Sequence, residues 1–171
     1  MKNQRMLDEL TELMRIDVSS GQETEIAEHL VKKLEQMGFA ITRDEAGATF
    51  GGVCGNILAV REGERDGVVC FCSHMDRVPG GIGIKPVEED GILRSSGDTI
   101  LAADDLSGVA AILEGVRQAI ESGKALPKLE ILFTVGEEAG LYGAKAFDVS
   151  LLTSKTMYVL DYPRNIYICI V

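Results

Sequence analysis

Tryptophan is missing from this chain of 171 residues, and aromatic residues make up only 5% of it. Apolar residues still amount to 46%, so the composition predicts a globular protein with an aliphatic core and excludes a disordered segment. A chain of this length suits a single domain that can bury its own core.

Cationic residues are also scarce, because 17 lysines and arginines stand against 27 acidic residues and give a formal net charge of −10. A surface of this sign repels polyanions, so we expect neither a nucleic-acid partner nor binding to an anionic membrane. No apolar run reaches the ~18 residues of a membrane-spanning helix. The first residues lack the apolar segment of a secretion signal.

The four cysteines contain no C-x-x-C pair. Cys70 and Cys72 would lie on one face of a strand, which favours small buried side chains over a disulfide framework. Together with the absence of a secretion signal, this indicates a reducing compartment, and we expect a cytoplasmic protein.

Apolar periodicity predicts strands that alternate with helices, which is typical of an α/β layered domain. Ser20 and Glu23 have the spacing of a capping box at the start of a helix that ends at Gly38. Asp90-Gly91 predicts a hairpin turn. We expect helices over 4–16 and 141–147, a long helix that follows Asp104-Asp105 and runs to about residue 122, and strands over 39–43, 56–61, 68–73, 129–135 and 157–160. A last strand is expected over 165–171, with an apolar edge that invites pairing.

The continuous apolar run Val68–Cys72 predicts a central strand covered on both faces. His74 and Asp76 follow it, and side chains two positions apart on an extended backbone point the same way. In open α/β sheets, ligands bind at the carboxyl ends of the strands. One imidazole and one carboxylate are therefore expected to face a binding site together.

Acidic residues follow three further apolar, strand-like runs: Asp104-Asp105, Glu137-Glu138 and Asp161. Taken singly, the aspartate pair suits a helix cap, the glutamate pair a solvated turn, and a lone His74 a structural histidine. Together they predict one site, in which crowded carboxylates need a cation to neutralise them. An imidazole with several carboxylates suits a divalent transition metal such as Zn²⁺.

Four motifs then resemble a known family, in order and spacing, over roughly residues 4–161. They are Ser73-His74-Met75-Asp76, Leu101–Gly108, Phe133–Gly143 and Tyr158-Val-Leu-Asp161. The chain is similar to the two-zinc exopeptidases that include aminoacylase and carboxypeptidase G, and most similar to their peptidase T (tripeptide aminopeptidase) branch. The resemblance implies a three-layer helix–sheet–helix fold with a mostly parallel mixed sheet.

The resemblance also implies the metal ligands. His74 and Asp161 would bind a first zinc ion, Glu138 a second, and Asp104 would bridge both, with Co²⁺ or Mn²⁺ as substitutes. Two metals that share a carboxylate form the co-catalytic arrangement of aminopeptidases.

The catalytic roles implied by the resemblance fall on Glu137 and Asp76. Glu137 would be the general base that takes a proton from the attacking water, and Asp76 would orient the imidazole. The substrate would be a short peptide. A related deacylase or dipeptidase remains the alternative enzyme.

Complete members of that family are considerably longer, with a lid and dimerisation domain and a returning segment that supplies a second metal-binding histidine. This chain has two histidines, and His29 matches no motif, so we interpret it as a surface residue. Residues 1–171 are thus expected to form the N-terminal part of one catalytic domain, poorly active alone. A catalytically incompetent metal-binding domain that pairs through 166–171, and a homo-oligomer, stay open.

Overall fold

The computed structural model describes residues 4–161 and 167–170. Its helices are α1 (Gln4–Met14), α2 (Thr24–Gln36), α3 (Ala103–Glu121) and α4 (Tyr142–Ala146), with short 3₁₀ turns η1 (Ala46–Thr49) and η2 (Val149–Leu151). The strands are β1 (Ala40–Arg43), β2 (Ile57–Arg61), β3 (Val68–His74), β4 (Pro86–Glu89), β5 (Ile92–Ser95), β6 (Lys128–Thr134), β7 (Thr156–Val159) and β8 (Tyr167–Ile170). None of these helices is both long and apolar enough to cross a membrane.

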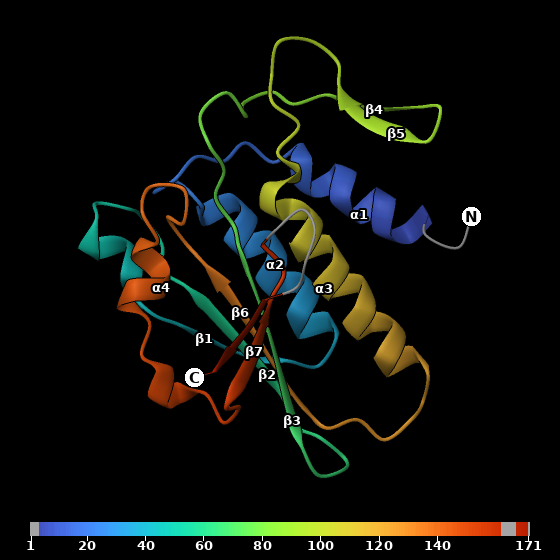
Figure 1. Cartoon of the computed structure of the whole chain (residues 1–171), viewed down its shortest axis with the longest axis vertical. Helices are drawn as coiled ribbons and strands as arrows, with labels where there is room; N and C mark the ends of the chain where they lie inside the picture. The colour runs from blue at the N-terminus through green and yellow to red at the C-terminus, as the bar shows by residue number, and fades with distance from the viewer. Residues whose placement is uncertain (1–3, 162–166, 171) are drawn as a thin grey trace.

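Six strands form one mixed sheet in the order β1-β2-β6-β3-β7-β8 (Figure 1). The three central strands β6, β3 and β7 are parallel, whereas the pairs β1–β2, β2–β6 and β7–β8 are antiparallel. The predicted α/β class, the mixed sheet and the central place of 68–73 are confirmed. β8 pairs with β7 as expected of a last strand, whereas residues 165, 166 and 171 of the predicted range 165–171 lie outside the described residues.

The two faces of the sheet are covered unequally. Apolar side chains of α1, α2 and α3 pack with one face in a single large core that contains Leu13, Leu30, Leu113, Ile131 and Phe133. On the other face, Cys70, Cys72, Leu132 and Met157 form a small cluster beneath the segment from α4 through η2. The second helical layer of the expected three-layer fold is therefore short in the described part of the chain.

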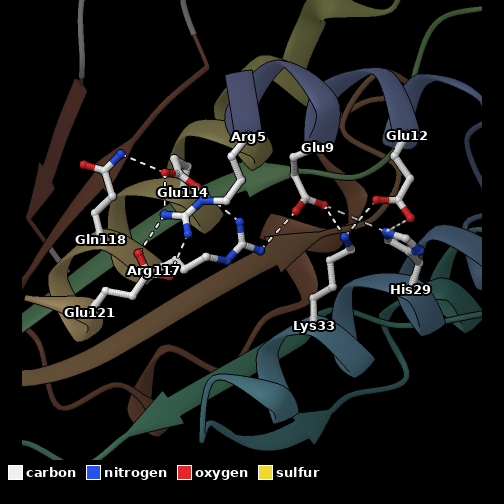
Figure 2. Close-up of polar contacts among 9 residues, drawn as sticks. All are labelled: Arg5, Glu9, Glu12, His29, Lys33, Glu114, Arg117, Gln118 and Glu121. Atoms are coloured by element: carbon white, nitrogen blue, oxygen red, sulfur yellow. Dashed lines mark hydrogen bonds and ion pairs between the residues drawn. The ribbon is translucent and has the colours of Figure 1, made fainter. Parts of the chain in front are cut away.

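Charged side chains also connect the three helices of the large layer (Figure 2). Arg5 of α1 binds both carboxylate oxygens of Glu114 on α3 at 2.8 Å. Lys33 of α2 lies 2.8 Å from Glu9 and 2.9 Å from Glu12, both on α1. The three helices are thus joined to one another by polar contacts as well as by the core.

His29 differs from its interpretation as a surface residue. Its side chain is 22% exposed and turns toward α1, where Nε2 lies 3.9 Å from Glu9 and 3.8 Å from Glu12 (Figure 2). The periodicity of α2 placed His29 at the edge of the apolar face, and α1 packs over that edge.

The hairpin predicted at Asp90-Gly91 is confirmed, and β4 and β5 stand apart from the main sheet (Figure 1). Asp90 and Gly91 have φ angles of 53° and 74°, as a tight two-residue turn requires. Two other expectations are wrong. Asp104 does not follow a strand but lies at a kink at the start of α3, where its φ and ψ angles are −85° and 114°, and the capping box at Ser20–Glu23 is absent, because no side chain caps α2.

Candidate metal centre

Three parallel strands bring their carboxyl ends to one edge of the sheet. His74 is the last residue of β3 and pairs with Thr134, the last residue of β6. Glu137 and Glu138 follow β6, and Asp161 follows β7. Because β3 lies between β6 and β7, the imidazole stands between the acidic groups.

The Nε2 atom of His74 faces three carboxylates. It lies 3.2 Å from Oδ1 of Asp104, 3.9 Å from Oε2 of Glu137 and 3.9 Å from Oδ1 of Asp161. The histidine side chain is only 2% exposed, whereas that of Asp104 is 74% exposed, so the group opens toward solvent on the α3 side.

The other ring nitrogen is held by the backbone. Nδ1 of His74 lies 3.0 Å from the main-chain oxygen of Asp76 and 3.4 Å from its Oδ1. A carbonyl oxygen can only accept, so Nδ1 carries the hydrogen, and in the neutral ring Nε2 is left with a free lone pair. Histidines that bind metals are commonly held in this way.

The carboxylate of Asp76 is fully buried and organises the turn after β6. It accepts hydrogen bonds from the backbone N–H groups of Glu137 at 2.9 Å and Glu138 at 3.1 Å. It also accepts one from the hydroxyl of Ser20 at 2.5 Å. Asp76 therefore contacts the imidazole and the glutamate turn at once.

Burial and crowding disturb the acid–base behaviour of the site. Burial raises the pKa of Glu137 and of Asp161, and the neighbouring carboxylates raise both further, while the imidazole of His74 opposes the change. Burial lowers the pKa of His74, but Asp76 and the other carboxylates outweigh it and raise that pKa to about 10. The acidic groups thus favour a positive charge at their centre.

Two overlapping groups of side chains could each hold an ion, because the ligand atoms within each group lie within 4.8 Å of one another. The first group is His74, Asp104 and Asp161, and the second is His74, Glu137 and Glu138. Asp104 raises the pKa of Asp161 and also that of Glu138, so its charge lies near both. An imidazole nitrogen and carboxylate oxygens are a donor set that suits a divalent transition metal. The side chains present therefore fit a metal.

Asp105 has a different role from its neighbour Asp104, to which it is joined by a cis peptide bond. Its carboxylate accepts a hydrogen bond from the hydroxyl of Ser73 at 2.5 Å and from the N–H of Gly108 at 3.2 Å. Burial raises its pKa to about 7. The bond to an N–H three residues later confirms the interpretation of Asp105 as a residue that caps the start of a helix.

Arg77 was not recognised in the sequence. Its side chain is 1% exposed and donates to the main-chain oxygens of Ile16 at 3.0 Å, Gly81 at 3.1 Å and Met14 at 3.3 Å. It thereby connects the end of α1 to the residue that follows Asp76. A lone arginine in a loop carries no sequence signal for such a role.

A cavity of about 560 Å³ adjoins the site on the thinly covered face of the sheet. His74, Glu137 and Asp161 line one part of it, and the remaining lining is mainly apolar: Cys72, Leu132, Leu141, Ala144, Phe147, Val149, Met157 and Val159.

Two of the solved structures that this chain resembles are peptidases. The aminopeptidase PepT from Bacillus cereus ATCC 10987 is 39% identical and superimposes with a TM-score of 0.90 over 94% of this chain and 43% of that chain. A tripeptidase from Staphylococcus aureus subsp. aureus Mu50 is 34% identical with a TM-score of 0.88, over 94% of this chain and 43% of that chain. The expected likeness to peptidase T is confirmed.

Among curated proteins, the uncharacterized protein YqjE of Bacillus subtilis is 38% identical over 162 residues, which are 94% of this chain and 44% of that protein. The chain thus spans less than half the length of these relatives. The model of peptidase family M28 matches residues 56–162, the greater part of the sequence, and its range contains all the candidate ligands described above. The chain belongs to peptidase family M28.

Proposed function

We propose that the chain carries the metal site and the general base of an exopeptidase that hydrolyses peptide bonds in short peptides. The observation that carries this proposal is the set of three carboxylates around Nε2 of His74, at 3.2–3.9 Å. The likeness to a tripeptidase and to an aminopeptidase supports the choice of short peptides as substrates.

In this proposal, His74, Asp104 and Asp161 hold one zinc ion, and Asp104 and Glu138 contribute to a second. Zinc is favoured because the donor set combines one imidazole with carboxylates. The ions supply positive charge that lowers the pKa of a water and polarises the carbonyl to be attacked.

Glu137 is proposed as the general base. It is 25% exposed, so its carboxylate can reach both the solvent and the site. The carboxylates of Glu137 and Glu138 both come close to His74, and in this proposal Glu138 binds an ion while Glu137 accepts a proton. Asp76 fixes this division by binding both backbone N–H groups. A well-placed base contributes ~10²–10⁴-fold to the rate.

Residues 1–171 are proposed to be the N-terminal part of a larger catalytic domain. The relatives are more than twice as long, and an apolar cavity lies open beside the site. Layers of a domain cover such sheet faces, so we assign this face to the segment that follows in the longer relatives. In the described residues, the second ion has only the two carboxylates of Asp104 and Glu138, and we expect the isolated chain to be a poor peptidase.

The experiment compares this chain with an extended protein that continues through the length of the relatives, both with saturating zinc or cobalt. We expect tripeptide turnover by the extended protein and very little by the short chain. Equal turnover by both, abolished in both by Glu137→Ala, would refute the proposed incompleteness. A panel of tripeptides, dipeptides and N-acyl amino acids tests the substrate class. Cleavage of N-acyl amino acids alone would replace the peptidase by a deacylase.

A cytoplasmic location and self-association are further parts of the proposal. The thiols of Cys54 and Cys70 are free, which suits a reducing compartment. The open sheet face would favour self-association of the short chain. Light scattering over a range of concentrations tests the second point, and a monomer at all of them would contradict it.

A further inference from the structure

The segment Ser20-Gly21-Gln22-Glu23 has the spacing of a capping box but does not cap a helix. Glu23 occupies the N-cap position of α2, and no side chain caps that end. The hydroxyl of Ser20 instead donates to Oδ2 of Asp76, 56 positions away, at 2.5 Å. The polar groups that the sequence assigned to α2 are therefore used elsewhere.

Glu23 is 0% exposed, which is unusual for a carboxylate with no arginine or lysine bound to it among the described residues. Its Oε1 accepts hydrogen bonds from the N–H of Gly21 at 2.8 Å and from the N–H of Gly136 at 3.0 Å. Its buried Oε2 has no hydrogen-bond partner in the described part of the chain. Its partners are thus two backbone groups, and one of them directly precedes Glu137.

Gly136 has little freedom of its own. Its φ is +58°, and a Cβ atom placed on it would come within 2.6 Å of the ring of Phe50. The ring therefore restricts one side of this glycine, and Glu23 holds its N–H.

Three consecutive backbone N–H groups are each bound by a buried carboxylate. Gly136 donates to Glu23, whereas Glu137 and Glu138 donate to Asp76. Asp76 in turn accepts the bond from Ser20. The loop between α1 and α2 thus acts on all three positions of the glutamate turn. Glu23 binds Gly136 directly, and Ser20 acts on Glu137 and Glu138 through Asp76.

We infer that Glu23 and Ser20 are positioning residues, which fix the direction of Glu137 and Glu138 relative to His74. This inference rests on the metal site proposed above, because the direction matters only if those side chains meet an ion and a water there. Sites of this kind need their groups held within a fraction of an ångström, and hydrogen bonds to the surrounding residues supply that accuracy.

The test uses the 171-residue chain without metal and four variants. Glu23→Met keeps the volume but removes the acceptor, Glu23→Gln keeps one acceptor oxygen, and Ser20→Ala removes the hydroxyl. Glu25→Met is the matched control, since Glu25 is an exposed acid in the first turn of the same helix. Amide hydrogen exchange is measured by NMR at positions 136–138 and across β2 and β6, and cobalt binding is titrated by visible absorption.

We expect faster exchange at Gly136 in Glu23→Met and at Glu137 and Glu138 in Ser20→Ala, with β2 and β6 unchanged. Exchange in Glu23→Gln and in the control should remain close to that of the parent. Cobalt affinity should fall ~10–100-fold in Glu23→Met, the usual effect of losing a group that orients metal ligands.

Unchanged exchange at positions 136–138 in the variants would overturn the inference. So would a uniform rise across β2 and β6, because that pattern indicates a loss of global stability only. Should Glu23→Met not fold, Ser20→Ala decides in the same way. Failure of the parent chain to bind cobalt would refute the proposed metal site, and the exchange data would still decide whether the turn is positioned by this loop.

Discussion

Nε2 of His74 and Oδ1 of Asp104 lie 3.2 Å apart, although 30 positions and the β4–β5 hairpin separate them in the chain. The first residue ends a strand and the second lies at the kink that precedes the regular part of α3. Their contact brings the start of α3 to the carboxyl edge of the sheet. The shared site is the basis of the predictions that follow.

We predict that His74→Ala removes the first metal from the chain and that His29→Ala does not. Zinc or cobalt should also stabilise the parent protein, because an ion that binds only the folded state adds ~2.7 kcal/mol to the free energy of unfolding at 100 times its Kd. Elemental analysis of protein purified without chelator, and thermal unfolding with and without metal, check this. Absence of metal from the parent after incubation with zinc, cobalt and manganese would contradict it.

Glu137→Gln should separate metal binding from hydrolysis in the extended protein. The amide cannot accept the proton of the attacking water, so turnover of a tripeptide should fall by ~10²–10⁴-fold. The metal content should stay at that of the parent, since Glu137 is not assigned as a ligand. Turnover within a factor of a few of the parent value would remove Glu137 from the role of general base.

Gly136→Ala should destabilise the chain more than Gly123→Ala does. Both glycines have positive φ, at +58° and +66°, so both variants carry the ~1 kcal/mol cost of a left-handed alanine. Only at Gly136 would the new methyl group meet the ring of Phe50, which adds ~1–3 kcal/mol of overpacking. Urea unfolding of the two variants measures the difference, and equal midpoints would show that the ring moves away freely.

His29 should make the chain less stable as the pH falls below about 6.5. Burial lowers the pKa of His29, Lys33 and Lys32 also lower it, and Glu12 and Glu9 oppose the change without reversing it. The unfolded chain therefore takes up this proton first, so stability is complete above the ordinary pKa and is lost as the pH falls through the folded value. His29→Gln removes this contribution.

The measurement is the free energy of unfolding of the parent and of His29→Gln between pH 5 and 8. All other titratable groups are shared, so the difference between the two proteins isolates His29. The variant should gain stability relative to the parent as the pH falls. A difference that does not change with pH would show that the histidine titrates alike in both states.

The sequence was sufficient for much of the fold and for the expectation that His74 and the acidic residues lie close together, because both depend on local patterns. The apolar run before His74 predicted a central strand, and the acidic residues after the runs at 129–135 and 157–160 predicted neighbours at its end. Parallel strands bring their ends together, so the pattern carries three-dimensional information. Asp104 lies beside His74 as expected, but it follows no strand, because residues 100–103 look like a strand in the sequence and lead into α3 instead.

Ser20, Glu23 and Arg77 could not be assigned from the sequence. The partner of Ser20 is 56 positions away and that of Glu23 is 113 positions away, and hydrogen bonds of this kind leave no periodic pattern. The local spacing of Ser20 and Glu23 predicted a helix cap. In the fold, Ser20 binds Asp76 and Glu23 binds the N–H of Gly136 instead. The environment of His29 was missed for the same reason, because α1 covers it from a distant part of the sequence.

The candidate ligands are spread along the chain, and this has a consequence for how long the edge of the sheet stays closed. His74, Asp104, Glu138 and Asp161 come from four segments that the backbone joins only through the hairpin, α3 and the α4–η2 region. Ions held as proposed would cross-link these segments, and every excursion that pulls a ligand away from its ion would have to break a coordinate bond. Chelation should therefore shorten the time for which the edge of the sheet resists proteolysis, even where the helical core is unchanged.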